Sequence, residues 1–392
     1  MAVSKSEFES ENLPDSKDTF SITQSQLELL EELGSGSFGP VYKGYCTLKQ
    51  GIRIPAAVRK LECDAESADE LLKGANMMKS LSHPRIVRMI GLCTADCVML
   101  VLELCLCGPL NSFLSKHKKT KQSSVVQLMY QVAQGMSYLH SKNFVHRDLR
   151  ANNVLLMSEF SAKISNFTMS RELDLGENVY QSEEASRGPF KWCAPECVYY
   201  WTFDTKSDVW SYGVTLWEAT SLGEDPYKKM TDNEILKFLV EDGKRLPKPE
   251  LCADEVYQIM LNCWEYDKKK RPLFEEIEEQ IKQQYQRMMK APTPPGRTLS
   301  KLRGRPPLPV PSSIEAANWT GGNWEQPEDN VNKRINIDMD VNKLEKIYDD
   351  LPRTKETFNI TGIGGRTWIG SVWTCTEGLL HSKTRRKNSS SC

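Results

Sequence analysis

The eight residues HRDLRANN at positions 146–153 decide the fold, because they fit the pattern H-R-D-L-x-x-x-N. Two further patterns flank them: GSGSFG at 34–39 fits G-x-G-x-x-G, and APE stands at 194–196. A lone G-x-G-x-x-G is a weak signal, since it also fits a dinucleotide-binding turn that opens a helix. Here VYKGY at 41–45 has the pattern of a strand, which predicts a glycine turn between two strands. Three ordered patterns over about 160 residues make a chance match negligible.

Taken together, these patterns resemble those of the protein kinases. The resemblance implies that Gly34, Gly36 and Gly39 let the backbone lie over the phosphates of ATP. It also implies that Asp148 is the base that accepts the proton of the substrate hydroxyl, and that Asn153 holds a magnesium ion. The expected fold is α+β and bilobal, with a small, mainly β N-terminal lobe carrying one main helix and a larger, mainly α C-terminal lobe. ATP and magnesium are the expected cofactors.

Shorter stretches narrow the resemblance. PFKW at 189–192 and the R-x-x-N that follows Asp148 are similar to the tyrosine kinases, and IVRMIG at 86–91 resembles the Syk family of non-receptor kinases. This likeness covers about residues 27–285. It implies a cytoplasmic protein that works with other signalling proteins. The family's tandem phosphotyrosine-binding domains have no counterpart in this sequence.

The resemblance also implies a slot for adenine. Leu102 takes the gatekeeper position, and Glu103 and Cys105 present backbone groups of the hinge between the lobes. Apolar walls with a few backbone polar groups suit adenine, although the same residues would serve as plain core. Weak, metal-independent nucleotide binding and an empty cleft therefore both stay open. The apolar walls are expected at Leu33, Val41, Ala57 and Leu155, and a stacked spine that joins the lobes at Met78, His146 and Phe167.

Three charged positions that catalysis requires in this family carry other residues. Arg59 stands where the phosphate-binding lysine belongs, and its guanidinium keeps the charge but is bulkier and differently shaped. Gly74 occupies the position of the helix glutamate that would pair with that lysine, so no carboxylate is supplied there. Asn166 and Thr168 make the D-F-G motif read N-F-T, and the uncharged Asn166 weakens or removes the magnesium site.

The size of these losses favours an impaired site. Removing one preorganised charge contact typically slows catalysis by about 10²–10³-fold, and such losses are not additive because the groups act as one unit. We therefore interpret the domain as a pseudokinase that acts by partner binding or conformational regulation. Two alternatives stay open: a slow but genuine kinase that moves the ATP γ-phosphate to protein tyrosine, and an adaptor that works through its proline-rich tail.

Composition along the chain predicts four segments, of which the third is rich in proline. In that segment Arg303, Pro306 and Pro309 fit R-x-x-P-x-x-P, a ligand pattern of Src-homology-3 domains. The segments are a disordered leader (1–26), a tyrosine kinase-like domain (27–290), a proline-rich linker (291–312) and a low-order tail (313–392).

Two tyrosines are candidate phosphorylation sites. Tyr180 lies between Asn166 and the APE motif, where Arg147 could pair with its phosphate. Tyr348 lies in the tail and precedes two aspartates. The alternative for both is an exposed tyrosine without a role, and we favour that alternative for Tyr348.

Composition excludes several other classes of protein. Lys and Arg total 51 and Asp and Glu total 52, so the net charge of −1 argues against a protein built to bind nucleic acid. No apolar run approaches the roughly 20 residues that a transmembrane helix needs. The twelve cysteines lack the spacing of a zinc site, and a long chain with a polar N-terminus does not predict a disulfide framework.

Overall fold

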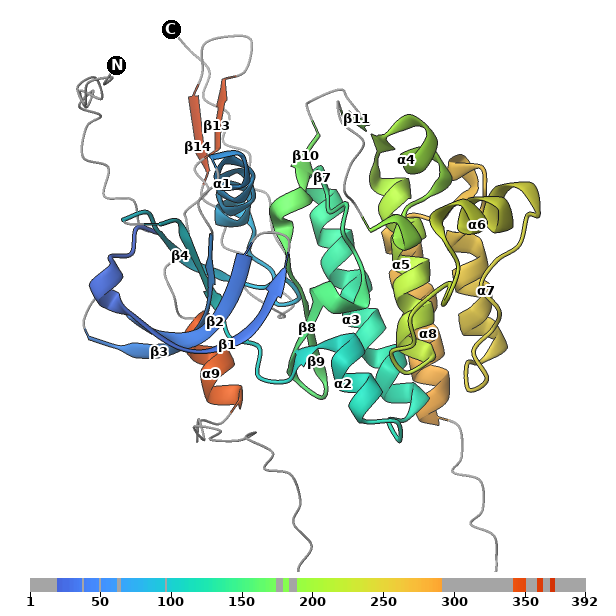
Figure 1. Ribbon diagram of the computed structural model, residues 1–392, viewed down its shortest axis with the longest axis horizontal. Coiled ribbons are helices and arrows are strands. Elements are labelled where there is room, and N and C mark those ends of the chain that lie inside the picture. Colours follow the sequence, from blue (N-terminus) through green and yellow to red (C-terminus); the bar gives the residue numbers. More distant parts are fainter. Residues whose placement is uncertain are drawn as a thin grey trace, which may run out of the picture. The chain divides into compact units, whose positions relative to one another are not determined.

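Figure 1 shows the structure, a computed structural model that describes residues 20–36, 39–48, 51–61, 65–95, 97–173, 179–182, 189–290, 341–349, 358–361 and 367–370. The described residues up to 349 belong to one compact unit, and two short strands after residue 357 belong to a second. In the first unit a five-stranded sheet with one long helix precedes a larger helical part (Figure 1). The α+β two-lobed fold expected from the sequence is therefore confirmed.

The sheet of the N-terminal lobe is antiparallel throughout, with the strand order β1-β2-β3-β5-β4. Strand β3 is central, and its alternate residues Ile54, Ala56 and Val58 are fully buried in one apolar cluster. Because strand residues alternate between faces, Ala57 and Arg59 point the other way. The strands are β1 (Leu27–Gly36), β2 (Gly39–Thr47), β3 (Arg53–Lys60), β4 (Met89–Cys93) and β5 (Met99–Glu103).

Helix α1 (Ala65–Ser80) is the one long helix of this lobe. Its buried side chains, Leu71, Ala75 and Met78, recur at intervals of three and four residues, the period of a helix with one apolar face. They belong to the same apolar cluster as Phe167 of the short 3₁₀ helix η3 (Phe167–Met169). Helix α1 thereby connects the sheet to the segment that carries Asn166.

The C-terminal lobe is built around helix α5 (Thr205–Thr220), whose residues from Ser207 to Thr220 are all buried. Its N-terminus is capped by Asp204, whose carboxylate accepts backbone N–H bonds from Lys206 and Ser207 at 2.9 and 3.0 Å. The surrounding helices are α2 (Leu110–Lys116), α3 (Gln122–Ser141), α4 (Pro195–Tyr200), α6 (Asp232–Leu236), α7 (Asp254–Cys263) and α8 (Phe274–Lys290), with a π-helical turn, η5 (Lys237–Glu241).

Small sheets position the loops of this lobe. Strand β8 lies between β6 and β9, β7 pairs with β10, and β11 pairs with β12. The segment that carries Asp148 and Asn153 runs from β7 to the short helix η2 (Ala151–Asn153). The strands are β6 (Gly108–Pro109), β7 (Phe144–Val145), β8 (Val154–Ser158), β9 (Ser161–Ile164), β10 (Arg171–Glu172), β11 (Tyr180–Gln181) and β12 (Thr202–Phe203).

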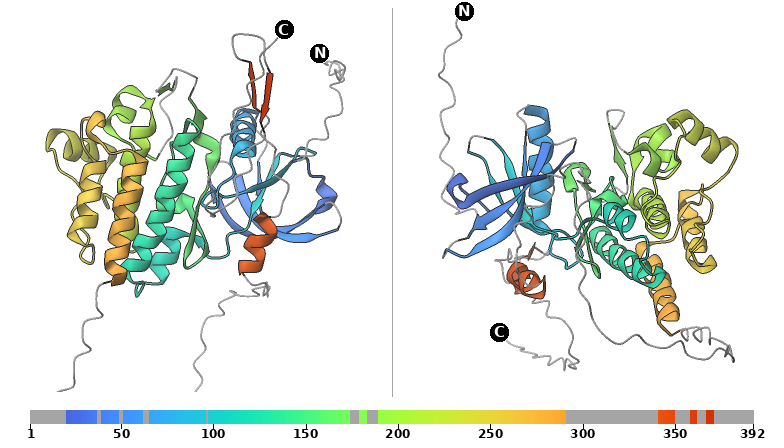
Figure 2. Two further views of the ribbon diagram at one scale, coloured as in Figure 1. Left: turned by 180° about the vertical axis from the view of Figure 1, so that it is seen from behind. Right: turned by 60° about the horizontal axis from the view of Figure 1, so that its bottom comes forward.

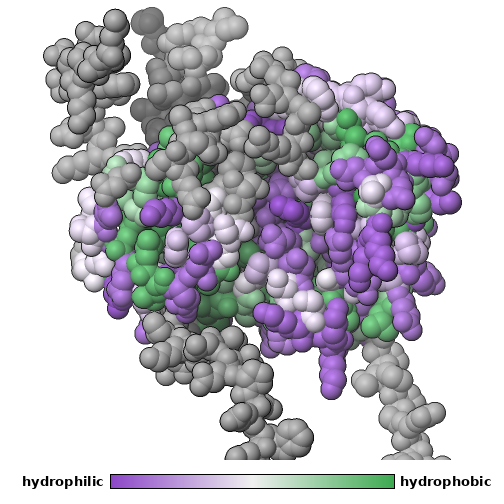
Figure 3. All heavy atoms as spheres, in the orientation of Figure 1, coloured by the Kyte–Doolittle hydropathy of each residue, from purple (hydrophilic) through white to green (hydrophobic). Residues whose placement is uncertain are grey.

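Three observations concern the surface, the helices and the cysteines. Hydrophilic side chains are prominent over the helical lobe in the view of Figure 3. Within the described ranges, no helix is both long enough and apolar enough to span a membrane. The nine cysteines that the structure describes are all free.

The tail contains ordered elements that the sequence did not predict. Helix α9 (Val341–Asp349) buries Leu344 and Tyr348, which are four residues apart and so share one face. Strands β13 (Phe358–Thr361) and β14 (Thr367–Gly370) form an antiparallel hairpin in the second unit. A helix of nine residues is stable mainly through its tertiary packing, so its residue pattern alone does not predict it. The proline-rich segment with Arg303, Pro306 and Pro309 lies outside the described residues.

Candidate functional site

The loop that carries Asp148 is fixed by a carboxylate from the core of the helical lobe. Asp208 of α5 accepts the backbone N–H of His146 at 2.8 Å and that of Arg147 at 3.0 Å. These bonds hold Arg147 at φ 68°, in the left-handed region that non-glycine residues rarely adopt. Sequence reasoning gave Asp208 no role, because its partners are backbone groups about 60 residues away in the chain.

Asp148 itself is 5% exposed and is surrounded by polar partners. The amide of Asn153 donates to the backbone carbonyl of Asp148 at 2.7 Å, and the Arg150 guanidinium lies 3.0 Å from the Asp148 carboxylate. Burial raises the pKa of Asp148, and the nearby Arg150 opposes that rise. Asp148 and Asn153, the last residue of η2, therefore lie side by side.

The substituted residues meet in one chain of hydrogen bonds. Arg59 Nη1 donates to Asn166 Oδ1 at 2.9 Å, and Asn166 Nδ2 donates to Asp148 Oδ2 at 2.8 Å. Arg59 Nη1 also lies 3.5 Å from the hydroxyl of Thr168. Lys60, the neighbour of Arg59, is exposed and does not take its place. The amide of Asn166 thus links the guanidinium from the sheet to the carboxylate of the loop.

Gly74 explains how α1 comes so close to this chain. A Cβ atom built at Gly74 would lie 3.0 Å from the backbone O of Phe167 and 3.0 Å from the Cα of Thr168. These distances are tighter than ordinary van der Waals contact, and the neighbouring atoms belong to backbone. The absence of a side chain therefore does more than remove a carboxylate, because it lets α1 pack directly on η3.

The residues of the expected spine are buried together. His146 and Phe167 meet edge to face with 5.2 Å between their ring centroids, and His146 Nε2 lies 3.0 Å from the carbonyl of Ser165. Met78 of α1 is buried in the same apolar cluster as Phe167. Asn166, which precedes Phe167, has φ 66° and so adopts a left-handed conformation.

The residues expected to line an adenine slot lie on strands of both lobes. Ala57 of β3 lies opposite Leu102 of β5, and Val41 of β2 lies opposite Arg59. Leu155 lies on β8 in the C-terminal lobe and is partly buried, whereas Leu33 on β1 is 51% exposed. Gly34 and Gly39 lie in β1 and β2, and Gly36 ends β1.

The hinge holds an ion pair that sequence reasoning missed. The Glu103 carboxylate is buried and accepts bonds from Lys163 Nζ at 2.9 and 3.1 Å and from the backbone N–H of Arg88 at 2.8 Å. The backbone carbonyl of Cys105 accepts a bond from the N–H of Gly108 at 3.3 Å. The sequence pattern indicated the apolar residues around adenine but gave no sign of the ion pair between Glu103 and Lys163.

Comparison with known proteins decides the family. Residues 27–281, well over half of the chain, match the family of protein tyrosine and serine/threonine kinases. The chain belongs to this kinase family.

Three related kinases are tyrosine-protein kinases. Tyrosine-protein kinase SYK of Gallus gallus is 46% identical over 257 residues, which are 65% of this chain and 42% of that protein. Tyrosine-protein kinase ZAP-70 of Homo sapiens is 44% identical over 271 residues, or 68% of this chain and 44% of that protein. Tyrosine-protein kinase HTK16 of Hydra vulgaris is 42% identical over 259 residues. The kinase domain is thus of the Syk and ZAP-70 type, and the chain spans less than half the length of these relatives.

Kinases of this family use ATP and magnesium, and the two fit this cleft differently. Two of the apolar residues expected around adenine, Leu102 of the N-terminal lobe and Leu155 of the C-terminal lobe, pack against the same apolar cluster, and such a surface suits the base. The metal position fits poorly, because Asn166 is uncharged and its oxygen already accepts a bond from the Arg59 cation. Among the residues that the structure describes, no three His, Cys, Asp or Glu side chains group as metal ligands.

Tyr180 lies on β11 where two arginines reach its ring. The guanidinium carbon of Arg147 lies 4.6 Å from the ring centroid of Tyr180 and 4.1 Å from that of Phe203, and Arg171 lies 5.7 Å from Tyr180. Tyr180 is partly buried in this arrangement. A phosphate on its hydroxyl would have cationic neighbours, so Tyr180 stays a candidate site.

Tyr348 differs from the expectation. The sequence favoured an exposed tyrosine, but only 1% of Tyr348 is exposed, and its hydroxyl makes two hydrogen bonds. The expectation was wrong because acidic neighbours along the chain do not reveal that the opposite face of a short helix packs on a sheet.

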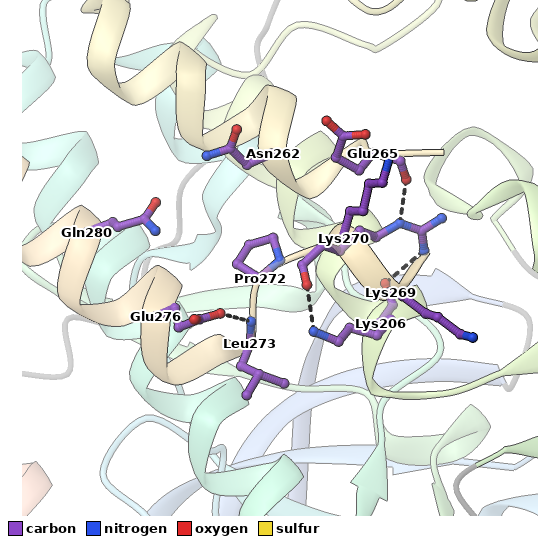
Figure 4. A pocket seen from close by; sticks show the side chains of 10 residues that line it. Lys206, Asn262, Glu265, Lys269, Lys270, Pro272, Leu273, Glu276 and Gln280 are labelled. Atoms are coloured by element: carbon purple, nitrogen blue, oxygen red, sulfur yellow. Dashed lines mark hydrogen bonds between the residues drawn. The ribbon is translucent and has the colours of Figure 1, made fainter. Parts of the chain in front are cut away.

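A hollow of about 560 Å³ in the kinase's helical lobe has no part in this site (Figure 4). Two of its four cationic side chains bond within the lobe: Lys206 Nζ donates to the carbonyl of Arg271 at 2.6 Å, and Arg271 Nε donates to that of Glu265 at 2.8 Å. Arg271 also pairs with Glu196 of the APE motif, with one N–O distance of 2.9 Å. Bonds within the lobe therefore account for Lys206 and Arg271.

Proposed function

We propose that this tyrosine-kinase-type domain is catalytically impaired and acts in intracellular signalling through partner binding or conformational regulation. The observation that carries the proposal is the chain of hydrogen bonds from Arg59 through Asn166 to Asp148. The Arg59 guanidinium, which would contact the ATP phosphates, and the Asp148 carboxylate, which would contact the substrate hydroxyl, are both bonded to the neutral amide of Asn166. Each group would have to give up its partner before it could take part in phosphoryl transfer.

The helix side of the cleft supports the same proposal. An active arrangement needs a carboxylate from the helix to orient the cation of β3. Gly74 supplies none, and a Cβ atom at that position would lie only 3.0 Å from the backbone of Phe167 and Thr168, so a side chain there would crowd the close approach of α1. Loss of one or two such contacts costs about 10²–10³-fold each when taken alone, which would reduce a turnover of about 1–100 per second to a very slow one.

Nucleotide binding is proposed as weak and independent of metal. The walls at Ala57, Leu102 and Leu155 suit adenine, and Arg59 keeps a positive charge near the phosphate end. The neutral Asn166 favours free ATP over its magnesium complex, so magnesium binding is proposed as weak or absent. The proposed location is the cytoplasm, and the proposed partners are signalling proteins.

The proline-rich tail supports a second mode of action. Arg303, Pro306 and Pro309 are proposed as a ligand of a Src-homology-3 domain, because R-x-x-P-x-x-P matches the grooves that bind a polyproline helix. The kinase body would then anchor an adaptor segment. Deletion of residues 292–311 is expected to reduce capture by such a domain, and equal capture would remove this role.

Phosphotransfer to a tyrosine peptide tests the proposal. The chain and its Asp148→Ala variant are expected to give the same low rate, because Asp148 is not available as a base in the native cleft. Transfer is followed with ATP that carries a radiolabelled γ-phosphate. The protein is purified from a host without tyrosine kinases, so that no contaminating kinase contributes to the rate. Transfer by the native chain at ordinary kinase rates, lost in Asp148→Ala, would show the alternative, a genuine kinase.

A further inference from the structure

Helix α9 packs on the N-terminal lobe although 50 residues separate it from the end of α8. Leu344 and Tyr348 are buried in the apolar cluster that holds alternate residues of β3, whereas Asn342, Lys343 and Lys346 are exposed. Figures 1 and 2 show the helix against the sheet in every view. One face of α9 therefore packs on the sheet of the same chain.

The hydroxyl of Tyr348 joins two parts of the kinase domain. It donates to the backbone carbonyl of Pro55 in β3 at 2.6 Å and accepts the backbone N–H of Leu104 at 3.1 Å. Leu104 follows β5 in the hinge, and β3 carries Arg59. The backbone carbonyl of Tyr348 also accepts a bond from the Arg88 guanidinium. A single side chain thus ties the tail to the strand and to the hinge.

The same helix reaches the C-terminal lobe. Glu345 Oε1 accepts a bond from the hydroxyl of Ser161, the first residue of β9, at 3.0 Å. Met157 of β8 is fully buried in the cluster that holds Leu344 and Tyr348. Because α9 contacts both lobes beside the hinge, it braces their relative position.

We propose that Tyr348 is a phosphorylation site that is protected while α9 is docked, and that its phosphorylation keeps α9 released from the hinge. A separate tyrosine kinase with ATP is the modifying agent. A bond forms between the γ-phosphorus and the Tyr348 hydroxyl oxygen as the bond to the leaving ADP breaks, and the hydroxyl proton passes to the base of that kinase. The inference goes beyond the proposed function, since it does not depend on transfer by this chain.

Geometry makes the docked and phosphorylated states exclude one another. A buried hydroxyl cannot reach the active site of another enzyme, so only the released helix is a substrate. After modification, the phosphate carries about −2 charge and cannot donate to the Pro55 carbonyl. The Tyr348 oxygen, 2.6 Å from that carbonyl, would have no room for three phosphate oxygens. Burial also raises the pKa of the Tyr348 hydroxyl, which fits a site without solvent.

The test compares the full chain with a released and a matched control variant. Leu344→Asp places a charge in the apolar cluster, and Lys343→Asp places the same side chain on the exposed face one residue earlier. Each protein is treated with a purified tyrosine kinase of broad specificity, and mass spectrometry follows Tyr348 relative to Tyr266, which is 57% exposed. We expect the normalised rate at Tyr348 to rise at least tenfold in Leu344→Asp and to stay at the native value in Lys343→Asp. Equal rates in the native chain and Leu344→Asp would overturn the proposal.

Hydrogen exchange supplies a second readout that places no charge in the core. Tyr348→Phe keeps the ring and removes the acceptor of the Leu104 N–H, so the exchange of that amide should accelerate severalfold. In the native chain phosphorylated to completion, amides of both residues 341–349 and Leu104 should lose protection. Unchanged protection of the helix after phosphorylation would contradict the proposed release.

Discussion

Replacing Asn166 by aspartate tests the hydrogen-bond chain at its centre. The amide of Asn166 is a donor to Asp148 and an acceptor from Arg59, at 2.8 and 2.9 Å. Asn166→Asp keeps the size of the side chain and the acceptor, but it removes the donor. A carboxylate oxygen then faces the carboxylate of Asp148 at about the same distance, unless a cation lies between them.

The distances in the structure give the size of the change in stability that this substitution should cause. The lost bond is one between an amide and a charged acceptor, which contributes about 1.5–3 kcal/mol. The new repulsion at 2.8 Å is about 6 kcal/mol at an effective dielectric constant of 20, and the attraction to Arg59 offsets most of it. We therefore expect Asn166→Asp to lower the stability of the metal-free protein by about 2 kcal/mol, or about 4–8 °C in Tm.

Magnesium should reverse that loss only in the variant. At a concentration ten times its Kd, a ligand stabilises the native state by about 1.4 kcal/mol, which corresponds to about 3–5 °C in Tm for a domain of this size. The assay is thermal unfolding of the native chain and Asn166→Asp with and without 10 mM magnesium, and potassium chloride at equal ionic strength is the control. A shift of that size in the native chain, or its absence in the variant, would refute the reasoning.

Two further predictions concern packing and pH. Gly74→Ala should gain about 1 kcal/mol of stability from helix propensity but lose at least as much by crowding the backbone of Phe167. Urea unfolding should therefore show equal or lower stability than in the native chain. A stability gain of the full amount, about 1 kcal/mol, would contradict the close approach of α1. Burial raises the pKa of Glu218 to about 7, well above its value in an unfolded chain, so ionisation opposes folding as pH rises. The stability of Glu218→Gln relative to the native chain should therefore rise by up to about 3 kcal/mol between pH 5 and pH 8. The substitution keeps the local structure, because an amide oxygen can accept the same two bonds. Parallel profiles of stability against pH would exclude the raised pKa.

The catalytic roles of Asp148 and Asn153 stay predictions from local patterns in the sequence. The two residues are five positions apart, and Asn153 ends a short 3₁₀ helix from which its amide reaches the backbone carbonyl of Asp148, so their proximity depends on local chain geometry. The two lobes followed from the resemblance to the kinases, and the structure confirms them. The three substituted positions were also found in the sequence as departures from a motif.

What these positions do together was not predictable. Arg59 and Asn166 are 107 residues apart, and only the folded chain shows that one bonds the other. Gly74 indicated a missing carboxylate but gave no sign of the backbone that lies against it. Tyr348 depends on a partner nearly 300 residues away, Pro55, and a nine-residue helix has too few periods to reveal its buried face. Long-range contacts thus decided the parts that motifs could not.

The affinity for ATP with and without magnesium tests the central claim most directly. Calorimetric titration of the native chain gives both Kd values in one buffer, with a chelator in the metal-free arm. If Arg59 and Asn166 stay bonded to each other as they are in the structure, magnesium will leave the Kd of ATP unchanged or raise it. A Kd that magnesium lowers tenfold or more, equivalent to about 1.4 kcal/mol, would contradict the account and point to a working kinase cleft.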